Sequence, residues 1–137
     1  MGGMDEIGLD AANMTLDEFL LARIAEDKRV AMYAAGDDGR AEWSVDVVGD
    51  GPAGPGSAEH VARHDPARVL AECRAKRRLV LACRDVGPDL GFLGTRPEGL
   101  ADFPLTPRDQ HQFAALTLAV LALPYADHHD YRPDWRP

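Results

Sequence analysis

The 137-residue chain is long enough for one domain with a modest core, and its 45% hydrophobic and 28% charged content is ordinary for a globular protein. A formal net charge of -8 argues against broad binding to nucleic acids or membranes, which requires a positive surface. No run approaches the roughly 18 apolar residues of a membrane span, and the N-terminus lacks the basic start of a secretory signal. We therefore expect a cytoplasmic protein.

The first structural signals appear after a glycine-rich, acidic lead-in. We expect residues 1–13 to be flexible and a single helical domain to occupy residues 14–124. Thr15 and Glu18 form a capping box, in which each side chain satisfies the other residue's free backbone N–H. Apolar residues then follow helical spacing as far as Gly36, which predicts a helix over 16–35.

Residues 42–60 combine an alternating pattern with a turn-forming run. Trp43, Val45 and Val47 alternate with polar residues, which is typical of a short half-buried strand. The following run GDGPAGPGS is typical of a turn. These features predict a small β-hairpin within 42–60, although no returning strand is evident.

Two further helices begin with the same chemistry. Asp65 as the N-cap and Pro66 at the first helical position predict a helix over 66–85, and Thr106 with Pro107 predict another over 107–123. Between them, residues 87–105 hold four glycines and three prolines, which indicates an irregular connection. One face of the last helix carries Phe113, Leu116, Val120 and Leu123.

The sequence thus predicts a mainly α fold: a small three-helix domain, a short β-hairpin after the first helix, and a C-terminal tail over 125–137 that packs on the bundle. Tyr125, Tyr131 and Trp135 make this tail too aromatic for a disordered terminus. The alternative is that these rings form an exposed anchor for a protein partner. Cys73 and Cys83 fall ten residues apart in one predicted helix, too far for a disulfide, and are interpreted as buried thiols.

Charged residues interrupt the apolar stripes of the first two helices. Arg23 and Asp27 lie within the first stripe, and Glu72, Lys76 and Arg77 lie within or beside the second. An unpaired buried charge costs several kcal/mol, so we expect opposite charges to meet in a polar layer between the helices. The layer would fix the helix register; the alternative is a ligand pocket built around the same charges.

Histidines offer the remaining candidate chemistry. His60 and His64 are four residues apart, a spacing that lets two imidazoles share a metal ion such as zinc, and His128 in the tail would complete the site. The alternative is a surface pair near the start of a helix. The basic run RAKRR at 74–78 suggests nucleic-acid binding, but its positions spread around the helix. No motif of a nucleotide-binding or nucleophilic enzyme is present.

Three segments carry a resemblance to a known family. TLDEFLLARIAED, EHVARHDPARVLAECRAKRR and LALPYADHHDYRPDWRP are similar, in this order, to segments of a family of small uncharacterised proteins from actinobacteria and their phages. The resemblance implies no known activity. Many members carry a Cys-x-x-Cys between the last two helices, whereas residues 87–112 contain no cysteine here. His60, His64 and His128 match family positions, while His129 replaces a proline.

We therefore predict a non-enzymatic protein-interaction or scaffold module, associated with a phage or mobile element as the resemblance implies. Its partner is an unidentified protein or a second copy of the chain. The alternative is a small metal- or ligand-binding protein that uses His60, His64 and His128. A third hypothesis is a nucleic-acid-associated regulator that acts through the basic run.

Overall fold

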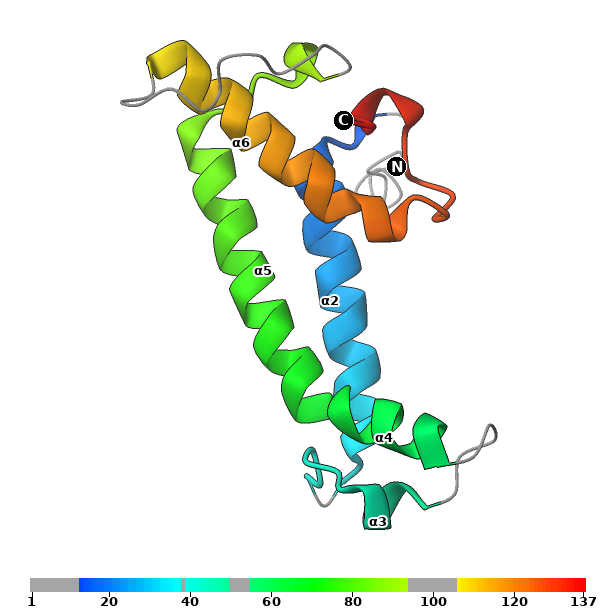
Figure 1. The fold of residues 1–137 in the computed structure, drawn as a ribbon. Coiled ribbons are helices and arrows are strands. Elements are labelled where there is room, and N and C mark those ends of the chain that lie inside the picture. Colours follow the sequence, from blue (N-terminus) through cyan, green and yellow to red (C-terminus); the bar gives the residue numbers. More distant parts are fainter. Residues whose placement is uncertain (1–12, 38, 50–54, 94–105) are drawn as a thin grey trace, which may run out of the picture. The chain divides into compact units, whose positions relative to one another are not determined.

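A computed structural model describes residues 13–37, 39–49, 55–93 and 106–137, so nearly all of the predicted lead-in at 1–13 lies outside the described residues. The described residues are mainly helical, which confirms the helical class (Figure 1). The chain divides into two compact units: unit 1 comprises residues 1–23 and 78–137, and unit 2 comprises residues 24–77. Over the described ranges, no helix has the length and apolar character needed to cross a membrane.

The predicted β-hairpin at 42–60 is wrong, because no strand occurs in the described part of the chain. The two valines of the alternating pattern lie in a short helix, α3 (Val45–Val48), and the expected return segment contains α4 (Pro55–Arg63). Ser44 explains the first difference: its side-chain oxygen accepts a hydrogen bond from the Val47 N–H at 3.2 Å, which caps α3. Gly49 then ends the helix with a φ of 74°. A three-member alternation is too short to outweigh a good N-cap.

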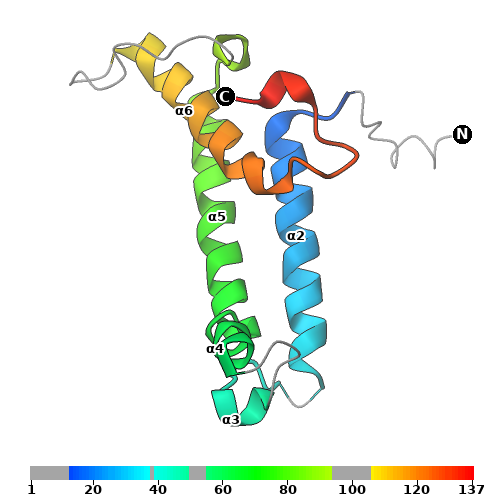
Figure 2. The ribbon, with the colours of Figure 1, turned by 45° about the vertical axis from the view of Figure 1, so that its right-hand side comes forward.

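Unit 1 is built from the first part of α2 (Leu16–Ala35), the last part of α5 (Pro66–Val86) and α6 (Pro107–Ala122). Figures 1 and 2 both show α6 crossing these ends of α2 and α5. The short 3-10 helices η2 (Leu90–Phe92), η3 (Leu123–Tyr125) and η4 (Pro133–Trp135) also belong to this unit. The helix starts follow the predicted chemistry. The Thr15 N–H donates to Glu18 Oε1 at 2.9 Å, and Thr106 Oγ1 accepts from the Asp109 N–H at 3.1 Å.

The core of unit 1 is centred on Phe19. Its ring is fully buried and lies 5.1 Å from Trp135, 5.7 Å from His128 and 5.8 Å from Tyr131, measured between ring centroids. These offset and edge-to-face arrangements are the ones that aromatic rings prefer. Trp135 is only 4% exposed, so the end of the tail contributes directly to the core.

Helix α6 has two apolar faces of different character. The face that packs inward is made of small residues and one leucine: Ala114, Ala115, Leu118, Ala119 and Ala122. The other face carries the larger apolar residues that the sequence pattern indicated. It points outward, since Phe113 and Val120 are each 50% exposed. The small inner residues let α6 approach its neighbours closely. The larger side chains of the other face are exposed to solvent.

Unit 2 contains the last part of α2, the first part of α5, and α3 and α4 between them. Within this unit, the last part of α2 and the first part of α5 lie side by side and run in opposite directions (Figures 1 and 2). Asp65 joins the connecting segment to α5: its Oδ1 accepts from the Arg68 N–H at 2.9 Å, and its Oδ2 accepts from the Trp43 N–H at 3.0 Å. The Asp65 carboxylate therefore caps α5 and holds Trp43 in place.

Candidate functional site

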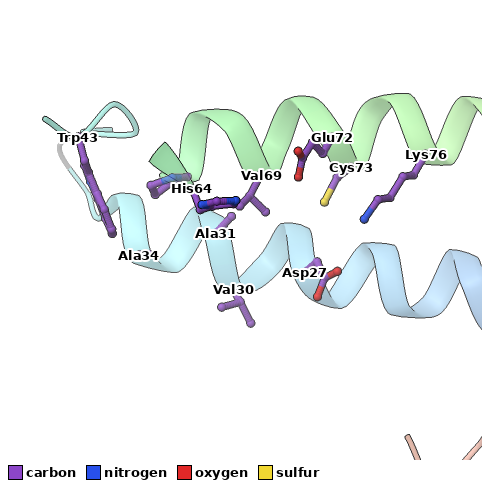
Figure 3. A pocket seen from close by; sticks show the side chains of 11 residues that line it. Asp27, Val30, Ala31, Ala34, Trp43, His64, Val69, Glu72, Cys73 and Lys76 are labelled. Atoms are coloured by element: carbon purple, nitrogen blue, oxygen red, sulfur yellow. The ribbon is translucent and has the colours of Figure 1, made fainter. Parts of the chain in front are cut away.

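A groove of about 410 Å³ opens in unit 2 between α2 and α5 (Figure 3). Its apolar end is formed by Trp43 together with aliphatic residues, and its polar end carries two carboxylates and an ammonium group. The lining residues are Asp27, Val30, Ala31, Ala34, Trp43, His64, Pro66, Val69, Glu72, Cys73 and Lys76. A volume of this size falls within the range of small-molecule sites, roughly 300–1,000 Å³.

Trp43 closes the apolar end of the groove and is held from two directions. Its backbone N–H donates to Asp65, and its indole Nε1–H donates to the Arg40 carbonyl at 3.0 Å. His64 also lines the groove, and its ring is drawn near Val69 (Figure 3). Trp43 also lines a second cavity, with Val47, Val48 and Val61. The indole is thus a fixed wall between two hollows of the same unit.

At the polar end, Lys76 extends from α5 towards α2, where Asp27 lies opposite (Figure 3). Glu72 forms an ion pair with Arg68 on its own helix, with 3.1 Å between Arg68 Nε and Glu72 Oε2. The Cys73 thiol lies between these charges and is 6% exposed. Burial raises the pKa of this thiol, and the negative charge of Asp27 raises it further. The thiol therefore stays protonated at neutral pH and is a poor nucleophile.

The residues predicted to form a polar layer are thus distributed over both units. Asp27, Glu72 and Lys76 line the groove of unit 2, whereas Arg77 is exposed and is not part of the lining. Arg23 belongs to unit 1, where its guanidinium lies 5.5 Å from the centroid of the Phe19 ring. A layer that joins all five residues stays a prediction.

The predicted metal-binding histidines also belong to different units. His60 and His64 lie in unit 2 with 4.5 Å between their ring centroids, and both are exposed. His64 Nδ1 donates to the His60 carbonyl at 3.0 Å, so in the neutral tautomer Nε2 is the ring nitrogen that is open to a metal. His128 lies in unit 1, in contact with Phe19. A joint site of the three histidines stays a prediction.

His128 belongs to a tighter group that the sequence interpretation did not single out. One ligand atom from each of His128, His129 and Asp130 lies within 4.8 Å of the others, and no other such group of three occurs among the described residues. The imidazoles of the two histidines stack with 4.4 Å between centroids. His129 Nε2 lies 3.5 Å from Asp130 Oδ1. The signal was present in the sequence as the consecutive run His-His-Asp.

The tail aromatics predicted as partner anchors are turned towards their own unit. Trp135 is buried and Tyr131 is half-buried, with 5.7 Å between their ring centroids. The Tyr131 hydroxyl is buried and makes no hydrogen bond. Tyr125 ends η3 and is half-buried. An exposed aromatic anchor would need these side chains to leave the core.

The model of the family of unknown function DUF6221 matches residues 13–137. The chain belongs to this family. The match covers both units and agrees with the resemblance to an uncharacterised family, and it carries no activity that could be transferred to the chain. Among curated proteins and solved structures, none matches the chain.

In this DUF6221 chain, the basic run at 74–78 lies on α5. Lys76 lines the groove, while Arg74, Arg77 and Arg78 are exposed on α5. Nucleic-acid binding requires several cations that face the phosphates together. The hypothesis of a nucleic-acid regulator stays a prediction.

Proposed function

We propose that this chain is a non-enzymatic protein-interaction module whose binding surface is the outer face of α6. The observation that carries the proposal is the exposure of large apolar side chains: Phe113 and Val120 on α6 are each 50% exposed, and Leu123, which caps α6 and begins η3, is 37% exposed. Leu116, between them on the same face, is half-buried. A contiguous apolar face of this kind on a folded helix is typical of an interaction site.

The spacing of these four residues, which we term the α6 seam, suits a partner helix. Phe113, Leu116, Val120 and Leu123 are separated by three, four and three residues, the a/d spacing by which two helices interlock. No Asp, Glu, Lys or Arg occurs from 110 to 126, so a partner can cover the seam without desolvating any of these charged groups.

We propose a second copy of the chain as the partner. If two α6 helices pair in antiparallel fashion about a two-fold axis, Phe113 of one copy lies opposite Leu123 of the other, and Leu116 lies opposite Val120. Each pair combines a larger with a smaller side chain, which favours close packing. The same surface then serves both copies, as two-fold symmetry requires.

Sedimentation analysis over a range of protein concentrations tests this proposal. We expect the wild type to form dimers, and we expect Val120→Asp to be monomeric because it places a charge near the two-fold axis. Met32→Asp is the matched control: Met32 is 55% exposed on α2 in unit 2, outside the seam, so this variant should still dimerise. A wild type that stays monomeric up to about 1 mM, where binding would contribute only about -4.1 kcal/mol, would overturn the proposal.

We also propose an association with a phage or mobile element, which is supported by the resemblance alone. A gene of this kind should be transcribed together with phage genes. Measurement of its transcript after prophage induction in the host tests this, and a transcript level that does not follow the phage genes would contradict it.

A second candidate function is metal binding, and the group of His128, His129 and Asp130 favours it. Two imidazoles and a carboxylate suit zinc, which accepts three protein ligands and a water. One feature opposes binding: His128 Nδ1 accepts a hydrogen bond from the Asp130 N–H at 3.0 Å, so the proton of its neutral ring is on Nε2. His128 must release either this bond or this proton to become a ligand.

Titration calorimetry with Zn²⁺ distinguishes the two sets of histidines. If the tail group binds the ion, His129→Asn should abolish the heat of binding and His60→Asn should leave it unchanged; both side chains are exposed, so neither change affects a core. The opposite result would favour the set His60, His64 and His128. The absence of any binding heat in the wild type would exclude a zinc function for both sets.

A further inference from the structure

A pair of histidines at the end of α4 is exposed on one side of the helix. His60 and His64 are four residues apart, and the His64 backbone N–H donates to the His60 carbonyl at 3.1 Å, so the turn between them is helical. Side chains at this spacing lie on the same face of a helix. Ala58, two residues before His60 and therefore on the other side of α4, is only 2% exposed. The inner side of α4 thus anchors the helix, and the outer side presents both imidazoles.

The two imidazole rings already have the separation that a shared metal ion requires. Their centroids are 4.5 Å apart, with 35° between the ring planes. Bonds from a metal ion to imidazole nitrogens are about 2.0–2.1 Å long, so an ion bound by two neighbouring imidazoles holds their centroids roughly 4.5–5 Å apart. Metal binding therefore needs rotation of the two side chains and no movement of the backbone.

The orientation of the His64 ring is fixed in the way that is typical of metal ligands. Histidines that bind metals usually donate their other ring N–H to a carbonyl or carboxylate, and His64 Nδ1 donates to the His60 carbonyl. The charged residues of α4 are paired with each other, with 3.8 Å between Arg63 Nη2 and Glu59 Oε1. An ion at the histidine pair therefore meets no unpaired cation of this helix.

We propose that His60 and His64 chelate a divalent late transition metal ion, with Cu²⁺ bound most tightly. Nitrogen ligands bind Cu²⁺ more tightly than the other divalent first-row ions, and its square-planar geometry accepts two imidazoles with water at the remaining positions. Zn²⁺ in proteins usually has three or four protein ligands, which the pair does not supply. Both ligands belong to unit 2, so this proposal depends neither on the α6 seam nor on the group of His128, His129 and Asp130 in unit 1.

Titration calorimetry with Cu²⁺ tests the pair in a His129→Asn background, which removes one ligand of the tail group. His60→Asn and His64→Asn should each weaken binding at least about tenfold, because the remaining imidazole lacks its partner. The matched control is Glu59→His combined with His60→Glu, which keeps the composition and the net charge. It places the two histidines five residues apart, on different faces of the helix, so it should bind Cu²⁺ as weakly as His60→Asn.

A second readout identifies the ligands of the bound ion. Diethyl pyrocarbonate modifies free imidazoles, and peptide mapping by mass spectrometry measures the modification of each histidine. An equimolar amount of Cu²⁺ should protect both His60 and His64. His111, which is exposed on α6 in unit 1, should react equally with and without the ion.

Equal Cu²⁺ affinity in the background chain and in the Glu59→His, His60→Glu variant would reduce the effect to the number of histidines and overturn the proposal. Protection of only one of the two histidines, or binding of Zn²⁺ as tightly as Cu²⁺, would overturn it too. All of these substitutions change exposed side chains, so we expect each variant to fold. Circular dichroism checks this, and the protection experiment on the background chain needs no variant of the pair.

Discussion

The two units differ in how completely they bury their large apolar side chains. The largest fully buried side chains of the described residues are Phe19, Leu16, Leu20, Leu118 and Val80, and all of them belong to unit 1. In unit 2 the buried apolar residues are smaller or fewer: Ile24, Ala31, Ala58 and Cys73, besides Pro66. Unit 1 therefore holds most of the stabilising core, whereas unit 2 has open apolar surface for binding.

This difference has a physical origin in the ring cluster of unit 1. Phe19 is surrounded by rings from the tail, so that a large side chain on α2 meets large side chains from far along the chain. Val30 on the same helix meets no comparable cover and stays 58% exposed. Local opening occurs first where few apolar contacts are buried, so we expect unit 2 to open more readily than unit 1.

The largest expected effect tests whether unit 1 holds most of the stabilising core. Phe19→Ala should lower the free energy of unfolding by about 3–5 kcal/mol, because it removes a fully buried ring and leaves a cavity. Urea unfolding followed by circular dichroism measures the change. Val30→Ala is the matched control in unit 2 and should cost no more than about 0.5 kcal/mol. Similar losses in the two variants would contradict the comparison.

A smaller effect is expected at Asp65 in unit 2. Asp65→Ala removes the cap of α5 and the acceptor for the Trp43 N–H, so it should cost roughly 0.5–2 kcal/mol at neutral pH. Asp65→Asn should cost less, because asparagine also caps helices. Thermal unfolding of the wild type and the two variants ranks their stabilities. An Asp65→Ala variant as stable as the wild type would show that unit 2 is held by other contacts.

The same residue predicts a pH dependence. Hydrogen bonds from the Trp43 and Arg68 N–H groups lower the pKa of Asp65 below its ordinary value of 3.8. Because the folded pKa lies below the unfolded one, the stabilisation is fully present above about pH 4 and is lost as the pH falls through the folded value. The advantage of the wild type over Asp65→Asn should therefore shrink as the pH falls below about 4. An advantage that grows on acidification would contradict the assignment.

The smallest effect has the opposite sign and falls in unit 1. The Tyr131 hydroxyl is buried without a hydrogen bond, and an unsatisfied buried polar group costs about 1–3 kcal/mol. Tyr131→Phe keeps the ring packing and removes this cost, so stability should stay equal or rise by up to about 1 kcal/mol. A clear loss in chemical denaturation would mean that the hydroxyl has a partner.

The helical class of the fold could be predicted because its signals are local. Thr15 with Glu18 and Thr106 with Pro107 specify helix starts through neighbouring backbone groups, and these contacts occur in the structure. The hairpin could not be predicted correctly, since the alternation at Trp43, Val45 and Val47 competes with the Ser44 cap over only a few residues.

The candidate groove was only partly predictable. The charges Asp27, Glu72 and Lys76 were recognised because they interrupt apolar stripes, but their surroundings depend on tertiary structure. Trp43 was interpreted as part of a strand, and its role as a wall depends on Asp65, 22 residues further along the chain. Likewise, periodicity identified the face of α6 that carries the larger side chains, whereas the face that packs inward is made mostly of alanines.

The two faces of α6 also differ in the substitutions that they tolerate during evolution. An added methylene at Ala115, which is fully buried, has to displace the helix from its neighbours, and overpacking typically costs about 1–3 kcal/mol. An exchange at Phe113 or Val120 alters the surface while the volume of the interior stays the same. A lineage can therefore change what its α6 recognises by substitutions that leave the fold intact, provided that the inner alanines are kept.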